Sequence, residues 1–162
     1  MKRTTGAGIA LAVVACGVLA WAEQATGVTP KLLARGTYEP FKVKTDPESP
    51  IDFEAKAKSH VDVVVRQHDY LVGGSTGWHS HPGPVFITVT QGRLTFYEAD
   101  DPTCTPKTID AADKVGYVDN GRGHIVRNES GAPAQDVSVI LAPVGGAFRT
   151  DLPLHANPNC PF

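Results

Sequence analysis

GGSTGWHSH at residues 73–81 and GRGHIVRN at residues 121–128 are the two stretches that decide how this chain folds. Both place histidine beside glycine turns and strand-like sequence. A β-strand sends the side chains at positions i and i+2 to the same face, so His79 and His81 are expected to point the same way. His124, on a neighbouring strand, would add a third imidazole. The two stretches therefore predict a metal site made of His79, His81 and His124.

The rest of the chain favours an all-β fold. Sixteen glycines and 13 prolines punctuate its 162 residues, and no long stretch repeats its apolar residues with a helical period. The apolar runs are short and rich in Val, Ile and Thr, which is typical of strands. Strands are expected at residues 61–72, 85–90, 93–97, 115–118, 124–127 and 137–142. Many short strands at this spacing indicate a sandwich or barrel.

Two local features complete this secondary-structure prediction. Gln91-Gly92 predicts a tight hairpin turn between the strands on either side of it. Residues 23–35 are expected to hold a short helix. Since no repeat or second domain is evident, residues 23–162 are interpreted as one domain, with a barrel core over about 36–145 and a C-terminal tail over 146–162.

The first 22 residues have the pattern of a signal peptide. Lys2 and Arg3 supply the positive end, residues 9–19 the apolar region, and Ala20-Trp21-Ala22 the cleavage site. We therefore expect an exported protein, periplasmic or secreted, with no membrane anchor after cleavage. Removal of Lys2 and Arg3 makes the formal net charge of −2 more negative by two, so the chain has no basic surface typical of nucleic-acid binding.

The three cysteines also bear on whether the protein is exported and whether it is anchored to a membrane. Val13-Val14-Ala15-Cys16 loosely resembles a lipobox, and lipidation at Cys16 is the alternative that would leave the protein on a membrane. The other two, Cys104 and Cys160, are an even pair in a chain expected to be exported, where disulfides persist. A disulfide between them is predicted, and two free thiols are the alternative.

The first histidine stretch resembles the first motif of the cupin superfamily. That motif is Gly, five residues, His-x-His, three or four residues, Glu, six residues and Gly. Gly73, His79, His81 and Gly92 fall in place, while Val85 stands where the family has its Glu ligand. A valine cannot coordinate a metal.

The second stretch resembles the second cupin motif, which ends with Pro-x-Gly, two residues, His, three residues and Asn. Gly121, His124 and Asn128 match, and Asp119 stands where Pro is usual. The resemblance implies a double-stranded β-helix, a jelly-roll-like barrel. His79, His81 and His124 would then hold a divalent transition metal (Fe, Zn, Mn, Ni or Cu) inside it.

The missing Glu leaves the ligand set open. His68 lies on the expected strand 61–72 and is the alternative fourth ligand. Gln91 and Asp119 could support the ligands from behind. Trp78 could wall the pocket or pack in the core, Asn128 could fix a turn, and Arg122 could meet an anion or lie in solvent.

Two functions follow from this site. Three His leave coordination positions open, and some cupin dioxygenases use three His around iron, so one hypothesis is a metal-dependent dioxygenase or related enzyme acting on a small molecule. The other is a non-catalytic module that binds a metal or a small ligand. No catalytic acid or base can be named from the sequence, and substrate, metal identity and the choice between monomer and homodimer stay open.

Overall fold

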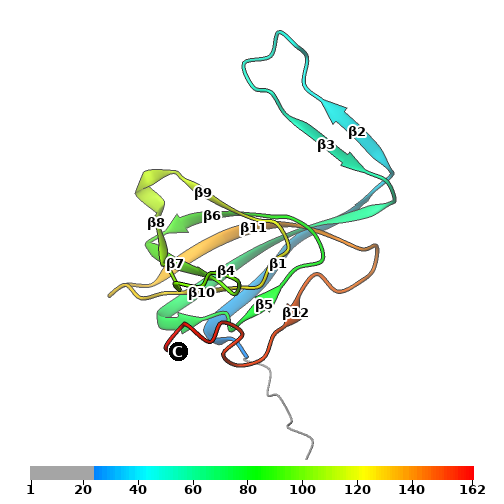
Figure 1. The fold of residues 1–162 in the computed structure, drawn as a ribbon. Helices are drawn as coiled ribbons and strands as arrows, with labels where there is room; N and C mark the ends of the chain where they lie inside the picture. Colours follow the sequence, from blue (N-terminus) through cyan, green and yellow to red (C-terminus); the bar gives the residue numbers. More distant parts are fainter. Residues whose placement is uncertain (1–23) are drawn as a thin grey trace, which may run out of the picture.

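The computed structural model describes residues 24–162, which form a nearly closed all-β barrel (Figure 1). The all-β fold predicted from the sequence is confirmed. The strands, in chain order, are β1 (Thr26–Tyr38), β2 (Phe41–Lys44), β3 (Glu54–Ala57), β4 (Val61–Ser75), β5 (His79–Ser80), β6 (Val85–Gln91), β7 (Arg93–Glu98), β8 (Lys107–Asp110), β9 (Gly116–Asp119), β10 (His124–Arg127), β11 (Ala134–Ala142) and β12 (Thr150–Asp151). A short 3₁₀ turn, Ala111–Asp113, follows β8. The predicted signal peptide and the alternative of lipidation at Cys16 lie outside the described residues.

Two walls of antiparallel strands build the barrel. One wall has the order β1, β4, β11, β6, β9. The other has the order β12, β5, β10, β7, β8. The walls meet where Arg127 of β10 pairs with Ser75 of β4. Between residues 24 and 162 no helix is long and apolar enough to cross a membrane.

The core lies between the two walls. Along β11, every second residue is buried, as the strand period requires: Ala134, Asp136, Ser138, Ile140 and Ala142. The apolar members pack with Val64, Ile87, Leu94, Phe96 and Val126 from both walls. Removal of this apolar surface from water is the main force that holds the walls together. Asp136 and Ser138 interrupt the apolar pattern and mark the place where the interior turns polar.

The Gln91-Gly92 turn does not join two paired strands, so the predicted hairpin is wrong. Both sides of β6 are already occupied, by β11 and β9, and β7 pairs with β10 and β8 instead. The chain therefore crosses from one wall to the other at Gly92. Its φ is +67°, and a Cβ there would lie 2.7 Å from the carbonyl oxygen of Pro133, so the crossing requires glycine.

The predicted helix within residues 23–35 is also wrong, because strand β1 occupies that region. Residues 31–35, KLLAR, favour a helix when taken alone. Pairing along nearly the whole length of β4 overrides this preference. Pro30 is tolerated because, among residues 24–162, β1 pairs only with β4 and no strand pairs with its other edge.

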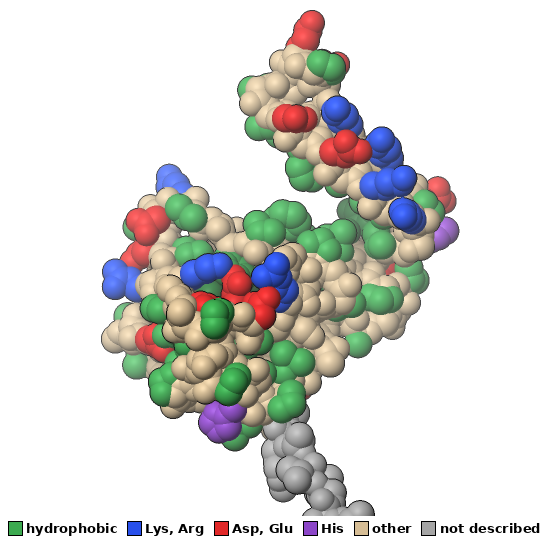
Figure 2. Space-filling model, in the orientation of Figure 1, with side chains coloured by type: hydrophobic (Ala, Val, Ile, Leu, Met, Phe, Trp, Pro, Cys, Tyr) green, Lys and Arg blue, Asp and Glu red, His purple; other side chains and the backbone are tan. Residues whose placement is uncertain are grey.

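The sequence did not predict the strands in two further segments, the β2–β3 hairpin and the C-terminal tail. β2 and β3 form a two-stranded hairpin that projects from the barrel, and Lys, Asp and Glu side chains run along it (Figures 1 and 2). The C-terminal tail folds back on the barrel, where β12 pairs with β5. The predicted disulfide joins Cys104 to Cys160, with their Cα atoms 5.3 Å apart. It therefore fixes the end of the tail to the loop between β7 and β8.

Candidate metal centre

Three imidazoles converge inside the barrel. His79 comes from β5, His81 follows that strand, and His124 begins β10 opposite His79. One ring nitrogen from each lies within 4.8 Å of the other two, which is close enough for one metal ion. The ring centroids are 4.4 Å apart for His79 and His124, 4.9 Å for His79 and His81, and 5.3 Å for His81 and His124.

Backbone carbonyls fix the tautomer of two rings. His79 Nδ1 lies 2.8 Å from the carbonyl oxygen of Gly77, and His81 Nδ1 lies 2.6 Å from that of Phe148. Because a carbonyl only accepts, Nδ1 donates in each pair, and Nε2 of the neutral ring keeps its lone pair. Proteins orient metal-binding histidines in this way.

The surroundings of His124 fit a metal for a different reason. The ring is buried, and within the described residues neither of its nitrogens has a hydrogen-bond partner. Among the same residues, Asp119 Oδ2 is also buried without a hydrogen-bond partner, and it lies 3.5 Å from His124 Nδ1. Buried polar atoms left without partners are costly. A cation at Nε2, with Nδ1 turned to Asp119, would satisfy all of them.

The surroundings of His79 and His81 favour the neutral form of each ring, which is the form that binds a metal. Burial lowers the pKa of His79 well below its ordinary value, and electrostatic interactions with His124 and Arg149 lower it further. Burial, followed by His124, lowers the pKa of His81 to about 4. Both rings are therefore neutral at neutral pH, as ligands must be. Burial raises the pKa of Asp119, but interactions with His124, the backbone of Gly121 and His81 together outweigh it, and the net pKa is lowered. Asp119 is thus a carboxylate.

Within residues 24–162, the group of possible metal ligands consists of the three histidines and includes no carboxylate. Val85 is fully buried. It lines a narrow cavity beside the three histidines, and this cavity has a volume of about 30 Å³. Ile87, Val126 and Ile140 continue this apolar wall. A metal held by three imidazoles here would keep positions open toward the cavity.

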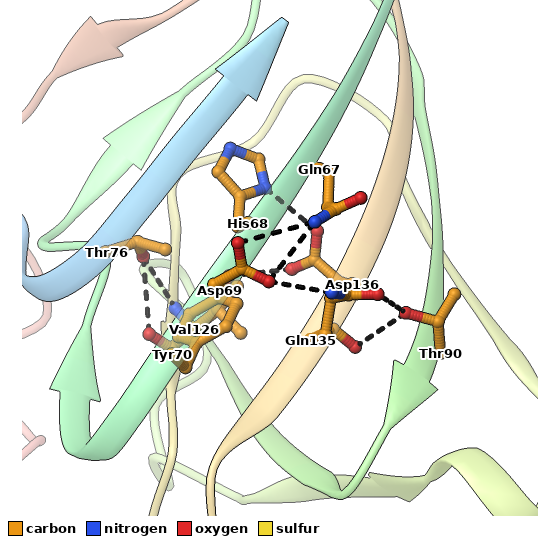
Figure 3. A network of polar contacts seen from close by, with 9 residues as sticks. All are labelled: Gln67, His68, Asp69, Tyr70, Thr76, Thr90, Val126, Gln135 and Asp136. Atoms are coloured by element: carbon orange, nitrogen blue, oxygen red, sulfur yellow. Dashed lines mark hydrogen bonds and ion pairs between the residues drawn. The ribbon is translucent and has the colours of Figure 1, made fainter. Parts of the chain in front are cut away.

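His68 lines the same cavity but is engaged elsewhere. Its Nδ1 lies 2.8 Å from Asp136 Oδ1, and the Tyr70 hydroxyl donates to Asp136 Oδ2 at 2.7 Å (Figure 3). His68 and Tyr70 are two residues apart on β4, and Asp136 faces them from β11. The alternative of His68 as a fourth ligand is not what the structure shows, since the grouped nitrogens are those of His79, His81 and His124.

Asp136, Arg66 and Arg149 were missed by sequence reasoning, although all three line the cavity. Nothing in the sequence marks them. Asp136 reaches His68 only through the register of β4 and β11, and Arg149 reaches the cavity only because the tail folds back.

The remaining predicted residues have other roles. Trp78 packs in a cluster with Ile125 and Cys160, away from the cavity. Asn128 fixes a turn, because its amide donates to the carbonyls of Leu71 and Ala132. Arg122 is exposed and pairs with Asp100, and Gln91 is exposed. Of the two proposed supporting residues, only Asp119 adjoins a ligand.

Comparison with known proteins finds a family model that matches part of the chain, and solved structures that share its fold. A family model described as "Cupin domain" matches residues 67–140, which include all three histidines. No curated protein matches.

Solved structures also resemble the chain. The polyketide cyclase RemF from Streptomyces resistomycificus is similar with a TM-score of 0.54 and 14% identity, over 98% of this chain and 90% of its own. A cupin superfamily protein from Desulfitobacterium hafniense gives a TM-score of 0.48 and 12% identity, over 76% of this chain and 84% of its own. A double-stranded β-helix protein from Klebsiella pneumoniae gives 0.47 and 20%, over 72% and 86%.

Proposed function

We propose that this chain, which carries a cupin-type domain, binds one divalent transition metal through His79, His81 and His124 and presents it to a small anionic molecule. One observation carries the proposal. Three imidazoles, of which His79 and His124 are buried and His81 is half-buried, bring a nitrogen each within 4.8 Å of one another. No hydrogen bond within the described residues accounts for the nitrogens of His124. Fe, Zn, Mn, Ni and Cu all suit imidazole ligands, so the donor set does not choose among them.

The anionic character of the ligand follows from charge. Three neutral imidazoles leave the charge of a divalent cation uncompensated, and Asp119 stands behind His124 rather than among the ligands. Val85 leaves the adjoining position apolar and unable to coordinate. An anion that enters the cavity would therefore be held at the metal.

Two activities fit this centre. The first is a metal-dependent oxygenase or related enzyme, for which the metal would supply Lewis-acid or redox chemistry. It is favoured by Asp136, a buried carboxylate that lines the cavity and holds Tyr70 and His68, so that proton-carrying groups lie beside the centre. The second is a non-catalytic module that binds the metal and its ligand.

We also infer that the protein is exported, with residues 1–22 as its signal peptide and 23–162 as one domain. The Cys104–Cys160 disulfide supports an oxidising compartment.

The metal proposal is tested on protein purified with its disulfide intact. Elemental analysis and titration should find one metal per chain in the wild type, and none after His79→Ala, His81→Ala or His124→Ala. His155→Ala is the matched control, since His155 is exposed in the tail. His68→Ala should keep the metal. A wild type without metal, or retention of metal by His124→Ala, would overturn the site.

A further inference from the structure

A second cavity adjoins the metal centre. It has a volume of about 230 Å³ and is lined in part by exposed residues: Gln24 and Ala25 before β1, and Pro30 on β1. The cavity therefore lies on the outer side of the barrel. Four residues line both cavities: Arg66, His68, Thr76 and Arg149. A molecule that reaches the three histidines from this outer cavity must pass them.

Arg66 is the charged group in this passage whose guanidinium is not held by a carboxylate. It is half-buried, and within residues 24–162 its guanidinium makes neither a hydrogen bond nor an ion pair. Its contact is with the ring of Phe148, whose centroid lies 4.9 Å from Cζ. Burial lowers the pKa of Arg66, and the like charge of Arg149 lowers it further, while Asp136 and Tyr70 offset only part of this effect. A partly buried charge without a hydrogen-bonded counter-ion is unfavourable, and an anion beside it would reduce that cost.

The carboxylates nearby are already engaged. Asp151 accepts from Arg149 Nε at 2.6 Å, and both oxygens of Asp136 bond to His68 and Tyr70. Arg149 is held further by donation from Nη2 to the carbonyl oxygen of Thr76 at 2.7 Å. Arg149 is therefore a fixed charge, and Arg66 has its donors free.

We propose that Arg66, with Arg149 behind it, binds an acidic group of the ligand in this passage, and that the ligand is a small organic acid with two anionic groups. One group lies at Arg66 and the other faces the three histidines. The planar guanidinium matches a carboxylate with paired hydrogen bonds. The outer cavity is smaller than sites for drug-sized ligands, which favours a short acid. This assignment rests on the proposed function, since the inner group needs the metal.

Calorimetry on the metal-loaded protein tests it with linear dicarboxylates from malonate to adipate, each against the monocarboxylate of equal chain length. At least one diacid should bind about tenfold tighter than the monoacid of equal length. The monoacid lacks the second carboxylate and so cannot form the charged hydrogen bonds to Arg66. Arg66→Gln should remove this preference and leave monoacid affinity within about twofold.

Arg93→Gln is the matched control, because Arg93 is exposed and pairs with Asp110 outside the cavity. Arg66→Lys keeps the charge without the planar fork and should retain part of the preference. If Arg66→Gln does not fold, an unchanged preference in Arg66→Lys overturns the proposal. Absence of any diacid preference, or its survival in folded Arg66→Gln, overturns the Arg66 site alone. A wild type that binds no metal overturns both this proposal and the proposed function.

Discussion

Asp119 Oδ2 lies 3.5 Å from Nδ1 of His124, and the side chains of both residues are almost completely buried. The position is one where the cupin motif usually has proline. Strand β9 ends at Asp119 and β10 begins at His124, so a short turn brings the carboxylate behind the imidazole. Gly121 makes the turn with a φ of +92°, where a Cβ would come within 3.1 Å of the carbonyl oxygen of His81.

Asp119→Asn should weaken metal binding by roughly 10- to 100-fold, because a carboxylate behind a histidine orients the ring and raises its basicity. The change keeps the size of the side chain and removes its charge. Titration against a competing chelator measures the effect. Asp100→Asn is the control, since Asp100 is exposed and pairs with Arg122. Equal affinity in wild type and Asp119→Asn would show that Asp119 does not act on the metal.

Asp62 should make the fold acid-sensitive. Its carboxylate accepts from Thr37 Oγ1 at 2.6 Å, Gly145 N at 2.9 Å and Arg35 Nε at 2.7 Å, and so joins β1, β4 and the segment after β11. These bonds, that from Thr37 first, lower its pKa from 3.8 to about 2. Because the pKa of Asp62 is lower in the folded than in the unfolded state, the carboxylate stabilises the fold at pH values above its unfolded-state pKa. This contribution is lost as the pH falls from about 4 to about 2.

Chemical unfolding measured from neutral pH down to about pH 2 tests this link. Asp62→Asn should be less stable than wild type at neutral pH, and the difference should shrink across that window. Asp52→Asn, a change on the exposed hairpin, should follow wild type throughout. A constant difference at all pH values would assign the effect of Asp62→Asn to packing instead.

The disulfide should contribute strongly to stability. Cys104 and Cys160 are 56 residues apart, and closing a loop of this size stabilises a fold by about 4 kcal/mol on the chain-entropy model. The double variant Cys104→Ser/Cys160→Ser should therefore unfold at a clearly lower temperature. Reduction of the wild type should reproduce the loss and leave the variant unchanged. If the melting temperature stayed equal under oxidising conditions, the tail would be held by packing alone.

Local sequence predicted the strands whose inner faces are apolar. β6, β10 and β4 carry alternating or continuous runs of Val, Ile and Phe, and their expected positions agree with the structure to within a few residues. β1 was missed because residues 31–35 favour a helix, and only pairing with β4 makes them a strand. Which strands pair was not readable either, because the partners of β6 are β11 and β9 rather than the next strand along the chain.

The residues of the candidate site also fall into those that local sequence could predict and those that it could not. His79, His81 and His124 were predictable because their spacing is local to two motifs. Asp136 joins His68 through a register between strands 68 residues apart, and no local pattern encodes such a register. Arg149 and the carbonyl of Phe148 reach the site from a tail that reads as irregular sequence.

Val85→Glu should restore the carboxylate that the metal centre lacks. Val85 is fully buried, lines the cavity and pairs across the sheet with Asp119, so a glutamate here would face the histidines beside another carboxylate. With metal bound, the new ligand should tighten binding and fill an open position, and small anions should then bind more weakly. Without metal, the buried charge should destabilise the fold by several kcal/mol.

Metal affinity and melting temperature, each measured with and without metal, separate the two effects of Val85→Glu. Val85→Gln is the matched control, because glutamine has nearly the same shape and length as glutamate but carries no charge to offer the cation. We expect Val85→Glu to bind metal more tightly than Val85→Gln, and metal to recover most of its lost stability. Lower stability in both variants with no gain in affinity for Val85→Glu would mean that position 85 does not face a metal, and the open three-histidine centre would have to be abandoned.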